Sequence, residues 1–384
     1  MSTLESAAPR ADLRRRVVVI SASVGAGHDG TTRELAERLR ARGLRVDCLD
    51  VTDVFPWRLG RLLRGSYHSL LLRLPWIYDG LFAIARRFRG AAPITRALLR
   101  PVRARMRRAL PADADVVVST YPIASQLLGP LRRDGHLAAP VVTYVTDFAA
   151  HPIWLSPGVD VHYVAHETSR AQALAHAAAG VRVAGRVVSA RCAPASAAQQ
   201  RRARERFGLP PDAPLALVVA GAWGVGEVAA TAADIARTGA AIPVTVCGRN
   251  EALRSRMLLA GTGPVLGWVD DMPELLRAAD VLVENGGGLT ALEAMACGLP
   301  VLTYRPLPGH GRASAAAMDE AGVSTLVRGR DQLGRALGEL TGGERGRRAR
   351  AAGLALFAGD PAAGIADLVA GSGRRAPGGD DRRR

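Results

Sequence analysis

Short, almost continuously apolar runs alternate along the chain with stretches whose apolar residues recur at helical spacing. The first run, RVVVISAS from Arg16, leads through the glycine-rich turn VGAGHDG into the helical stretch TTRELAERLRARG, and a second run, LRVDCLD, follows. Similar runs recur at ADVVVST, PVVTYVTD and VDVHYVA. Uninterrupted apolar runs are typical of parallel strands that helices cover on both faces, so this part of the chain predicts a sheet of βαβ units.

A segment of small and polar residues, VVSARCAPASAAQQ at 187–200, interrupts the alternation and predicts a hinge. A second alternation begins at PLALVVAGAWGVGE and continues through IPVTVCG, PVLGWV, ADVLVENGGG and LPVLTYR. A chain of 384 residues also exceeds what one hydrophobic core usually organises. We therefore expect an α/β protein with two Rossmann-like domains, at 16–190 and 191–370, between a flexible N-terminus (1–15) and a disordered tail (371–384).

One stretch of the first domain, 57–110, does not follow the Rossmann pattern. It holds thirteen arginines against a single acid, Asp79, and its apolar residues keep helical spacing on either side of Pro75. Each helical segment would combine an apolar stripe with a basic face, as helices that lie on an anionic membrane surface do. The alternative is a helical hairpin that packs on its own sheet and leaves its arginines in solvent.

Composition favours anionic partners. All 51 cationic residues are arginines, and the formal net charge is +16. A coding bias would explain the absence of lysine, but the positive charge itself attracts lipid surfaces and phosphorylated substrates. Nucleic-acid binding is not expected, because the chain has no recognisable reader motif and no aromatic residues beside basic strands.

The cysteines and the N-terminus bear on the cellular setting. The four cysteines are far apart and form no CxxC pair, which indicates neither a zinc site nor a disulfide framework. The N-terminal apolar run is too short for a signal peptide or a membrane span. We expect a cytoplasmic protein whose membrane contact is peripheral, at the inner face of the cell membrane.

Three glycine-rich turns lie between a predicted strand and a predicted helix: GAGHDG, GAWGVG and NGGG. Such turns let a ligand approach the backbone and aim helix N-terminal amides at anionic groups. In the third, the loop Gly286–Gly288 with the amides of Leu289 and Thr290 would hold a diphosphate, and Glu293 would accept hydrogen bonds from ribose hydroxyls. The alternative is that Thr290 and Glu293, at capping-box spacing, only close the helix start.

Several motifs in order resemble one family. GAGH, STYPIASQLL and VTDFAAHPIWL in the first half, and VTVCGRNEAL, VLGWVDDMPELLRAADVLV and GLTALEAMACGLPVL in the second, are similar to GT-B glycosyltransferases. The group contains the lipid-II-forming N-acetylglucosaminyl transferase and, as a closer match, the monogalactosyldiacylglycerol synthases. The resemblance runs from about Arg16 to Ser324.

The resemblance implies two Rossmann-like domains that face each other across a cleft. It places a UDP-sugar in the C-terminal domain and a lipid acceptor in the N-terminal one, with inversion at the anomeric carbon. No metal and no other cofactor are implied, because helix N-termini and loop amides stabilise the departing diphosphate.

The resemblance also assigns roles to residues. His28 would be the catalytic base, on a loop shaped by Gly25 and Gly27. Asp147 would orient an imidazole or bind acceptor hydroxyls, unless it only caps the next turn, and His151 and Trp154 would line the acceptor side of the cleft. The donor would be bound by Gly221, Gly224, Val269, Gly286, Gly287, Gly288, Leu289, Thr290, Glu293 and His310.

Two departures leave the sugar open. Where relatives carry an acid and amide pair against the donor hexose, this chain reads LPGHGR with His310 and Gly311, and where they often carry a PGT-like loop it reads NGGGL. We expect an inverting transferase that moves a hexose from a UDP-sugar to a diacylglycerol-like lipid, held at the anionic membrane by 57–110. The alternatives are a UDP-sugar 2-epimerase or hydrolase of the same fold, a transferase acting on another hydrophobic acceptor, and a non-catalytic module that binds nucleotide sugar or membrane.

Overall fold

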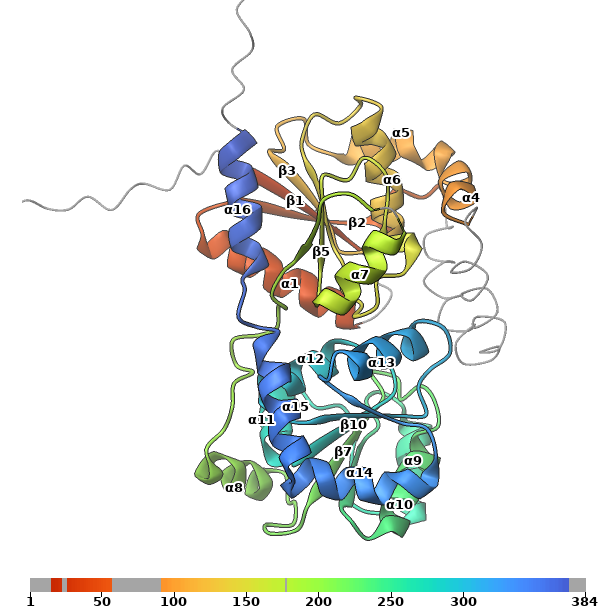
Figure 1. The fold of residues 1–384 in the computed structure, drawn as a ribbon, viewed down its shortest axis with the longest axis vertical. Helices are drawn as coiled ribbons and strands as arrows, with labels where there is room; N and C mark the ends of the chain where they lie inside the picture. The colour runs from red at the N-terminus through yellow and green to blue at the C-terminus, as the bar shows by residue number, and fades with distance from the viewer. Residues whose placement is uncertain (1–14, 23–25, 57–90, 177, 373–384) are drawn as a thin grey trace, which may run out of the picture.

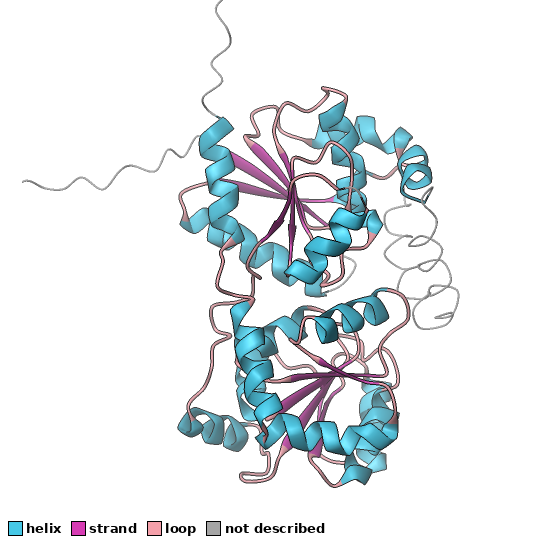
Figure 2. Cartoon of the chain, in the orientation of Figure 1, coloured by secondary structure: helices cyan, strands magenta, loops and turns pink. Residues whose placement is uncertain are grey.

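The computed structural model describes residues 15–22, 26–56, 91–176 and 178–372. These residues form two domains, each built on a six-stranded sheet in which every pairing is parallel (Figure 1). Helices lie on both faces of each sheet (Figure 2). The predicted α/β architecture of two Rossmann-like domains is confirmed.

The N-terminal sheet has the strand order β2-β1-β3-β4-β5-β6. Its centre is apolar, as the continuous runs predicted, because Val17 to Ile20 and Val116 to Val118 are completely buried. The strands are β1 (Arg16–Ser21), β2 (Arg45–Asp50), β3 (Val116–Ser119), β4 (Val141–Tyr144), β5 (Val161–Val164) and β6 (Val181–Val183). The helices and short 3-10 turns of this domain are α1 (Ala26–Ala41), η1 (Val51–Val54), α4 (Ala91–Leu98), α5 (Arg100–Ala109), α6 (Pro122–Arg133), η2 (Pro152–Trp154) and α7 (Glu167–Ala175).

The C-terminal sheet has the order β12-β11-β10-β7-β8-β9. Its strands are β7 (Leu215–Val219), β8 (Ile242–Val246), β9 (Val265–Leu266), β10 (Val281–Glu284), β11 (Val301–Tyr304) and β12 (Thr325–Val327). The remaining helices are α8 (Ala197–Arg206), α9 (Val228–Thr238), α10 (Glu251–Ala260), α11 (Met272–Ala278), α12 (Leu289–Ala296), α13 (His310–Glu320), α14 (Arg330–Gly342), α15 (Glu344–Ala355) and α16 (Pro361–Ser372).

The last helix crosses back to the first domain. Ile365 and Val369 of α16 are buried in the same cluster as Val17 of β1 and Leu35 of α1, and Arg42 pairs with Asp360 at 2.7 Å. The sequence pattern assigned residues up to 370 to the C-terminal domain, but the packing of α16 is on the N-terminal sheet (Figure 1). The reason is its apolar face, which completes the cover of β1.

Two segments therefore run between the domains, and they touch. The amide of Arg186 donates to the carbonyl of Leu356 at 2.8 Å. A Cβ atom on Gly185 would lie 1.7 Å from the carbonyl oxygen of Gly359, so only glycine lets the two backbones pass this closely. The predicted hinge at 187–200 begins immediately after this crossing.

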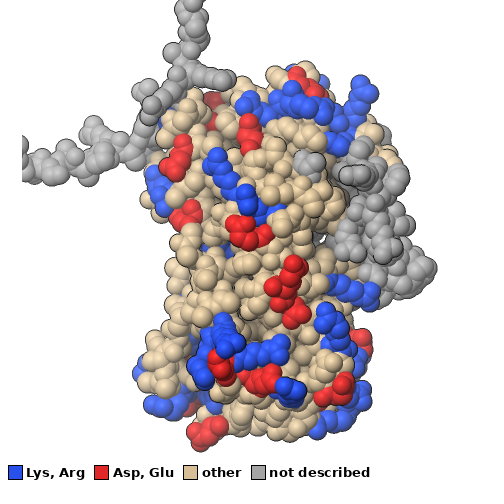
Figure 3. Space-filling view, in the orientation of Figure 1, with Lys and Arg blue, Asp and Glu red and all other residues tan. Residues whose placement is uncertain are grey.

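The basic stretch 57–110 is described only in its last part, since residues 57–90 lie outside the described residues. Helices α4 and α5 carry six arginines and no acid, and α4 exposes 51% of Ile94 and 75% of Leu98. Figure 3 shows arginines gathered at this end of the N-terminal domain, whereas over the C-terminal domain they alternate with acids. Within the described residues, no helix has the length and apolar character needed to cross a bilayer.

The crossing at Gly185 yields a stability prediction. Gly185→Ala is expected to lower the free energy of unfolding by about 1–3 kcal/mol, because the methyl group forces two backbones apart. Gly338→Ala is the matched control, since its Cβ meets no atom within 4 Å and alanine favours a helix. Urea unfolding measures both changes, and a Gly185→Ala protein as stable as the control would contradict the close crossing.

Candidate functional site at the junction of the two domains

Each sheet has one topological switch point, a pair of neighbouring strands from which successive connections run toward opposite edges of the sheet. In the N-terminal sheet it lies between β1 and β3, and in the C-terminal sheet between β7 and β10. Loops that leave the carboxyl ends of such a strand pair diverge, and ligands of open α/β sheets bind in the crevice between them. The turns GAGHDG, GAWGVG and NGGG follow β1, β7 and β10, so all three lie at a switch point.

The two switch points lie against each other. A Cβ atom on Gly30 of α1 would be 2.5 Å from Cδ2 of Leu289, the first residue of α12. Phe148, beyond the end of β4, is buried in the same apolar cluster as Leu292 of α12. The start of α1 in one domain therefore packs on the start of α12 in the other, as Figure 1 shows.

The predicted base lies at this junction. Gly27 and His28 belong to the first turn of α1, while Gly25 and the side chains of residues 23–28 lie outside the described part of the chain. Two threonines fix α1 at the switch point, because Thr32 Oγ1 and Thr120 Oγ1 are 2.8 Å apart in the core. The amide of Thr120 in turn donates to Ile20 at the end of β1.

The motif STYPIASQLL supplies a buried polar network at the neighbouring strand ends. Ser125 Oγ lies 2.9 Å from both Ser119 Oγ and Thr143 Oγ1, which joins α6 to the ends of β3 and β4. Gln126 donates to the carbonyls of Ile153 and Leu155 at 2.8 and 3.0 Å. The motif thus holds the HPIWL turn in place, which explains in physical terms why the two sequence motifs occur together.

Asp147 follows β4 and is fixed by Trp154, whose indole Nε1 donates to Asp147 Oδ2 at 2.9 Å. Trp154 was expected to line the cleft, but only 1% of it is exposed, so it acts on the site by orienting the carboxylate. His151 is 6% exposed and its Nδ1 accepts the amide of Ile153. Both residues therefore position the loop, and neither presents an open surface to an acceptor.

An arginine from the segment between the domains supports the same loop. Arg186 is 1% exposed, and its guanidinium donates to the carbonyl of Val145 at 2.7 Å and to that of Thr146. Its charge also lies over the Tyr144 ring, 5.3 Å from the centroid. The residue that follows the crossing at Gly185 thereby fixes the backbone immediately before Asp147.

In the C-terminal domain the two glycine loops are joined directly. Asn285 Nδ2 donates to the carbonyl of Val225 at 2.8 Å, which ties the loop after β10 to the loop after β7. Gly221 and Gly224 adopt positive φ values of 67° and 58°, which shape the GAWGVG turn. Both loops therefore form one backbone surface at the switch point.

A buried carboxylate decides which amides remain for a ligand. Glu284 ends β10 and is 6% exposed. Its carboxylate accepts hydrogen bonds from the Thr303 hydroxyl and the Gly286 amide, each at 2.6 Å, and from the Gly287 amide. Burial raises the pKa of Glu284 in spite of these donors. Gly286 and Gly287 belong to the loop that was expected to hold the diphosphate, but their amides donate to Glu284.

The amides left at this turn are those at the start of α12. Helix α12 begins at Leu289 with Gly288 as its N-cap and has no side-chain cap, and the first amides of a helix have no partner within it. Thr290 therefore lies inside the helix, and the capping-box interpretation of Thr290 and Glu293 is wrong. Gly288, Leu289 and Thr290 present the positive end of α12 to the junction.

Glu293 lies one turn further along α12. It is half-buried, and burial of its carboxyl raises the pKa of Glu293 to about 7. A carboxyl with this pKa changes charge near neutrality.

The two remaining donor candidates lie on either side of the switch point. Val269 follows β9, at one edge of the sheet, and packs on the apolar cluster that also contains Phe148 and Leu292. His310 is half-buried at the first position of α13, and the loop before it is tied to the switch point, because the amide of Leu307 donates to the carbonyl of Asn285 at 2.7 Å.

Several residues that build the site were not predicted from the sequence. They are Thr32, Thr120, Gln126, Arg186, Glu284 and Asn285. Glu284 carried a usable signal, since an acid at the end of an apolar strand and before a glycine turn must find donors when buried. Among the described side chains, no group of three or more His, Cys, Asp or Glu residues is arranged to hold a metal ion.

Comparison with known proteins agrees with this geometry. Residues 29–185 match the family model of monogalactosyldiacylglycerol (MGDG) synthase, and residues 219–340 match that of glycosyl transferases group 1. The chain has the GT-B fold, and it resembles the MGDG synthases in its first half and the group 1 glycosyl transferases in its second. The second segment contains both glycine turns of the C-terminal switch point, whereas the first begins at Asp29, just after β1 and His28.

Curated relatives carry related names. The "processive diacylglycerol beta-glucosyltransferase" of Bacillus licheniformis is 27% identical over 239 residues, 60% of this chain and 61% of that protein. The protein of the same name from Bacillus cereus (strain AH187) is 25% identical over 336 residues, 82% of each chain. The match therefore spans less than two thirds of the first relative and most of the second.

Solved structures share the fold. Acinetobacter baumannii MurG is 16% identical, with a TM-score of 0.52 over 93% of this chain and 99% of that one. Medicago truncatula UGT71G1, solved with UDP-glucose, is 13% identical, with a TM-score of 0.58 over 93% and 98%. Both similarities support the arrangement of two Rossmann-like domains.

The pKa of Glu293 yields a prediction for donor binding. If the ionised carboxylate accepts a ribose hydroxyl, lowering the pH from 8 to 6 protonates Glu293 and should weaken UDP-glucose binding by about tenfold, the worth of a hydrogen bond to a charged group. Calorimetric titration without acceptor measures this. Glu293→Gln should bind more weakly at pH 8 and show a flat pH profile, whereas a variant that keeps the wild-type pH dependence would exclude Glu293 as its source.

Proposed function

We propose that the chain transfers a hexose from a UDP-sugar to a diacylglycerol-like lipid, with inversion at the anomeric carbon. The single observation that carries the proposal is the contact of Gly30 with Leu289, because it brings the start of α1 next to the start of α12. A base on the first helix and an anion site on the second would then flank one reacting bond. The names of the related Bacillus proteins, diacylglycerol glucosyltransferases, support both the hexose and the acceptor.

In this proposal His28 removes the proton of the acceptor hydroxyl as that oxygen attacks the anomeric carbon. Asp147, held by Trp154, stabilises the imidazolium or binds the acceptor. The bond from the anomeric carbon to the β-phosphate oxygen breaks, and UDP leaves with the electron pair. The amides of Gly288, Leu289 and Thr290 and the dipole of α12 stabilise the charge that develops on the diphosphate.

The same amides and dipole support transfer without a metal ion, since they supply the positive potential that a cation would otherwise provide. Glucose is the donor to test first, because the relatives carry glucosyltransferase names. The resemblance places His310 where related enzymes contact the hexose, so we propose that it contributes to the choice of sugar.

We further propose that the protein works at the cytoplasmic face of the membrane. Helices α4 and α5 combine six arginines with the exposed side chains of Ile94 and Leu98. Apolar groups next to cations favour a headgroup boundary, and each arginine near an anionic surface contributes about 1 kcal/mol. The predicted role of the stretch 57–110 thus has support from its described part.

The transfer reaction yields a direct prediction for His28. With UDP-glucose and diacylglycerol in anionic vesicles, in the presence of EDTA, the wild-type protein should form glycolipid. His28→Ala should lower kcat by about 100-fold or more, the usual contribution of a general base. His136→Ala is the matched control, because His136 is exposed in the turn after α6 and should leave the rate unchanged.

Three outcomes would contradict parts of this proposal. Equal rates for the His28→Ala and His136→Ala proteins would remove His28 as the base. Activity that EDTA abolishes and Mg²⁺ restores would refute metal-independent transfer. Consumption of UDP-glucose without any glycolipid would favour the hydrolase or epimerase alternative.

A further inference from the structure

A hollow of about 640 Å³ opens at the carboxyl ends of β11 and β12, on the edge of the C-terminal sheet. Its lining residues are Tyr304, Arg305, Pro306, Arg312, Leu326, Val327, Arg328 and Arg330. Four of the eight are arginines and none is acidic. In the sheet, β11 is next to β10 and β12 is next to β11. Because neighbouring strands are about 5 Å apart, the hollow lies about 5–10 Å along the sheet from the switch point.

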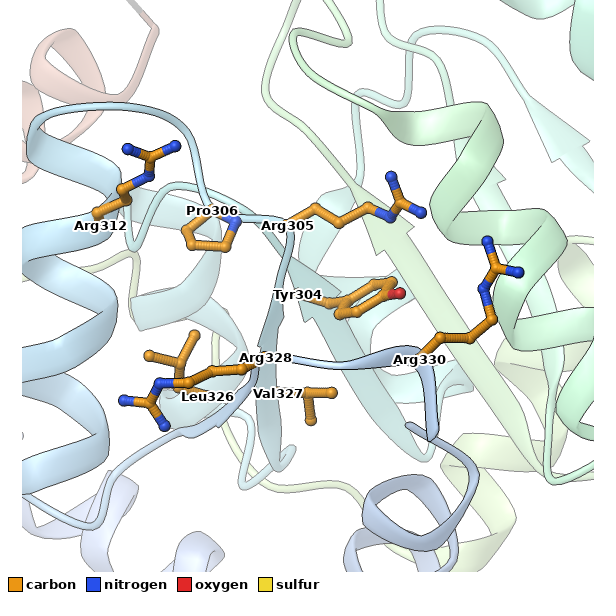
Figure 4. A pocket seen from close by; sticks show the side chains of 8 residues that line it. All are labelled: Tyr304, Arg305, Pro306, Arg312, Leu326, Val327, Arg328 and Arg330. Atoms are coloured by element: carbon orange, nitrogen blue, oxygen red, sulfur yellow. The ribbon is translucent and has the colours of Figure 1, made fainter. Parts of the chain in front are cut away.

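The four arginines come from two segments of the chain, 305–312 and 328–330. Arg305 and Arg328 directly follow β11 and β12, Arg330 begins α14, and Arg312 lies in the first turn of α13. Figure 4 shows Arg305 and Arg330 extended on one side of the end of β11, with Arg312 and Arg328 on the other side. Guanidinium groups therefore flank the hollow on both sides.

A buried carboxylate anchors one side of the hollow. The side chain of Asp234 is only 1% exposed. Its Oδ2 accepts hydrogen bonds from the Arg305 guanidinium at 2.8 Å and from the Tyr304 hydroxyl at 3.0 Å. Its Oδ1 forms an ion pair with Arg330 Nε at 2.8 Å and accepts a hydrogen bond from Arg237. Three guanidinium groups thus meet two acids, Asp234 and Glu227, which leaves a surplus of one positive charge on this side.

Arg305 is held in an unusual conformation. Within the described residues it is the only non-glycine residue with positive φ, at 53°. A second acid, Glu227, pairs with its guanidinium, which also lies over the Tyr304 ring at 5.3 Å. Backbone strain of this kind persists where the surroundings fix it and is common at ligand clamps.

Two arginines of the hollow are open to solvent. Arg328 and Arg330 are exposed, and the Arg330 side chain keeps 62% of its surface in spite of its bond to Asp234. Planar guanidinium groups bind phosphate oxygens through paired N–H donors. The volume also exceeds that of a bare ion, so the hollow has room for what a phosphate is attached to.

We propose that this arginine hollow is a second anion site, separate from the donor site, and that its ligand is a phosphate group. The phosphate belongs either to the headgroup of an anionic phospholipid or to a soluble phosphate. The proposal goes beyond the transfer reaction and does not depend on it. It adds to the basic stretch 57–110 a contact that lies in the other domain.

The test compares two double variants of equal charge. Arg328→Ala/Arg330→Ala removes two arginines of the hollow, and Arg335→Ala/Arg348→Ala removes two from α14 and α15 whose side chains are 85% and 79% exposed. Flotation with phosphatidylglycerol vesicles measures lipid binding, with phosphatidylcholine vesicles as the baseline. Calorimetry with inorganic phosphate measures the soluble source, and UDP titration measures the donor site.

The hollow variant should lose about tenfold or more in one of the two phosphate arms, since two arginines contribute there, while the control variant stays near wild type. Loss in the vesicle arm identifies a lipid headgroup, and loss in the phosphate arm identifies a soluble ligand. Arg328→Lys/Arg330→Lys should bind the phosphate or the vesicles with intermediate affinity, because lysine keeps the positive charge but lacks the planar guanidinium group. This variant also separates loss of binding from loss of folding.

Two results would overturn the proposal. If both double variants bind vesicles and phosphate equally, the hollow has no specific role. If UDP affinity falls in parallel with phosphate or vesicle binding in the hollow variant, the arginines belong to the donor site and no second site exists.

Discussion

The contact between the start of α1 and the start of α12 is the constraint on which the rest of the structure depends. Gly30 and Leu289 approach so closely that a side chain at position 30 would displace the leucine. Two sheets are thereby joined at their switch points, the places where each is able to bind a ligand. Three buried contacts fix elements that lead to this junction. Thr32 of α1 meets Thr120, Gln126 holds the HPIWL turn, and Arg186 supports the loop before Asp147. A site between two domains needs each half to be rigid, because a displacement of about 1 Å lowers catalysis strongly.

Glu284 determines how the C-terminal half can act. A carboxylate buried at the end of β10 must find donors, and it takes them from the first two glycines of NGGG. The turn is therefore rigid, and the amides that remain belong to the start of α12. The protein thus combines a structural carboxylate inside the turn with a helix N-terminus outside it. Glu293, whose pKa is about 7, lies one turn beyond and places a group that changes charge near neutrality beside the same helix start.

Much of this arrangement follows from local sequence patterns. The apolar runs predicted both parallel sheets, because strands covered on both faces need continuous apolar residues, and the glycine turns marked three of the four strand ends at the switch points. Long-range packing was not accessible in the same way. No local pattern shows that α16 returns to β1, that Trp154 is buried behind Asp147, or that the amides of Gly286 and Gly287 face inward. Each of these depends on a partner distant in sequence or on the direction of a backbone group, and neither is encoded in residue type alone.

The most direct test of the account is a double-mutant cycle on the contact itself. The rate of glycolipid formation from UDP-glucose would be measured for Gly30→Val, Leu289→Ala and the double variant. Gly30→Val is expected to lose at least about tenfold in kcat/KM, because its side chain displaces Leu289 at the start of α12. The double variant should then recover most of the loss, since alanine leaves space for valine. Independent, additive effects of the two substitutions would contradict the claim that the site is formed by this contact.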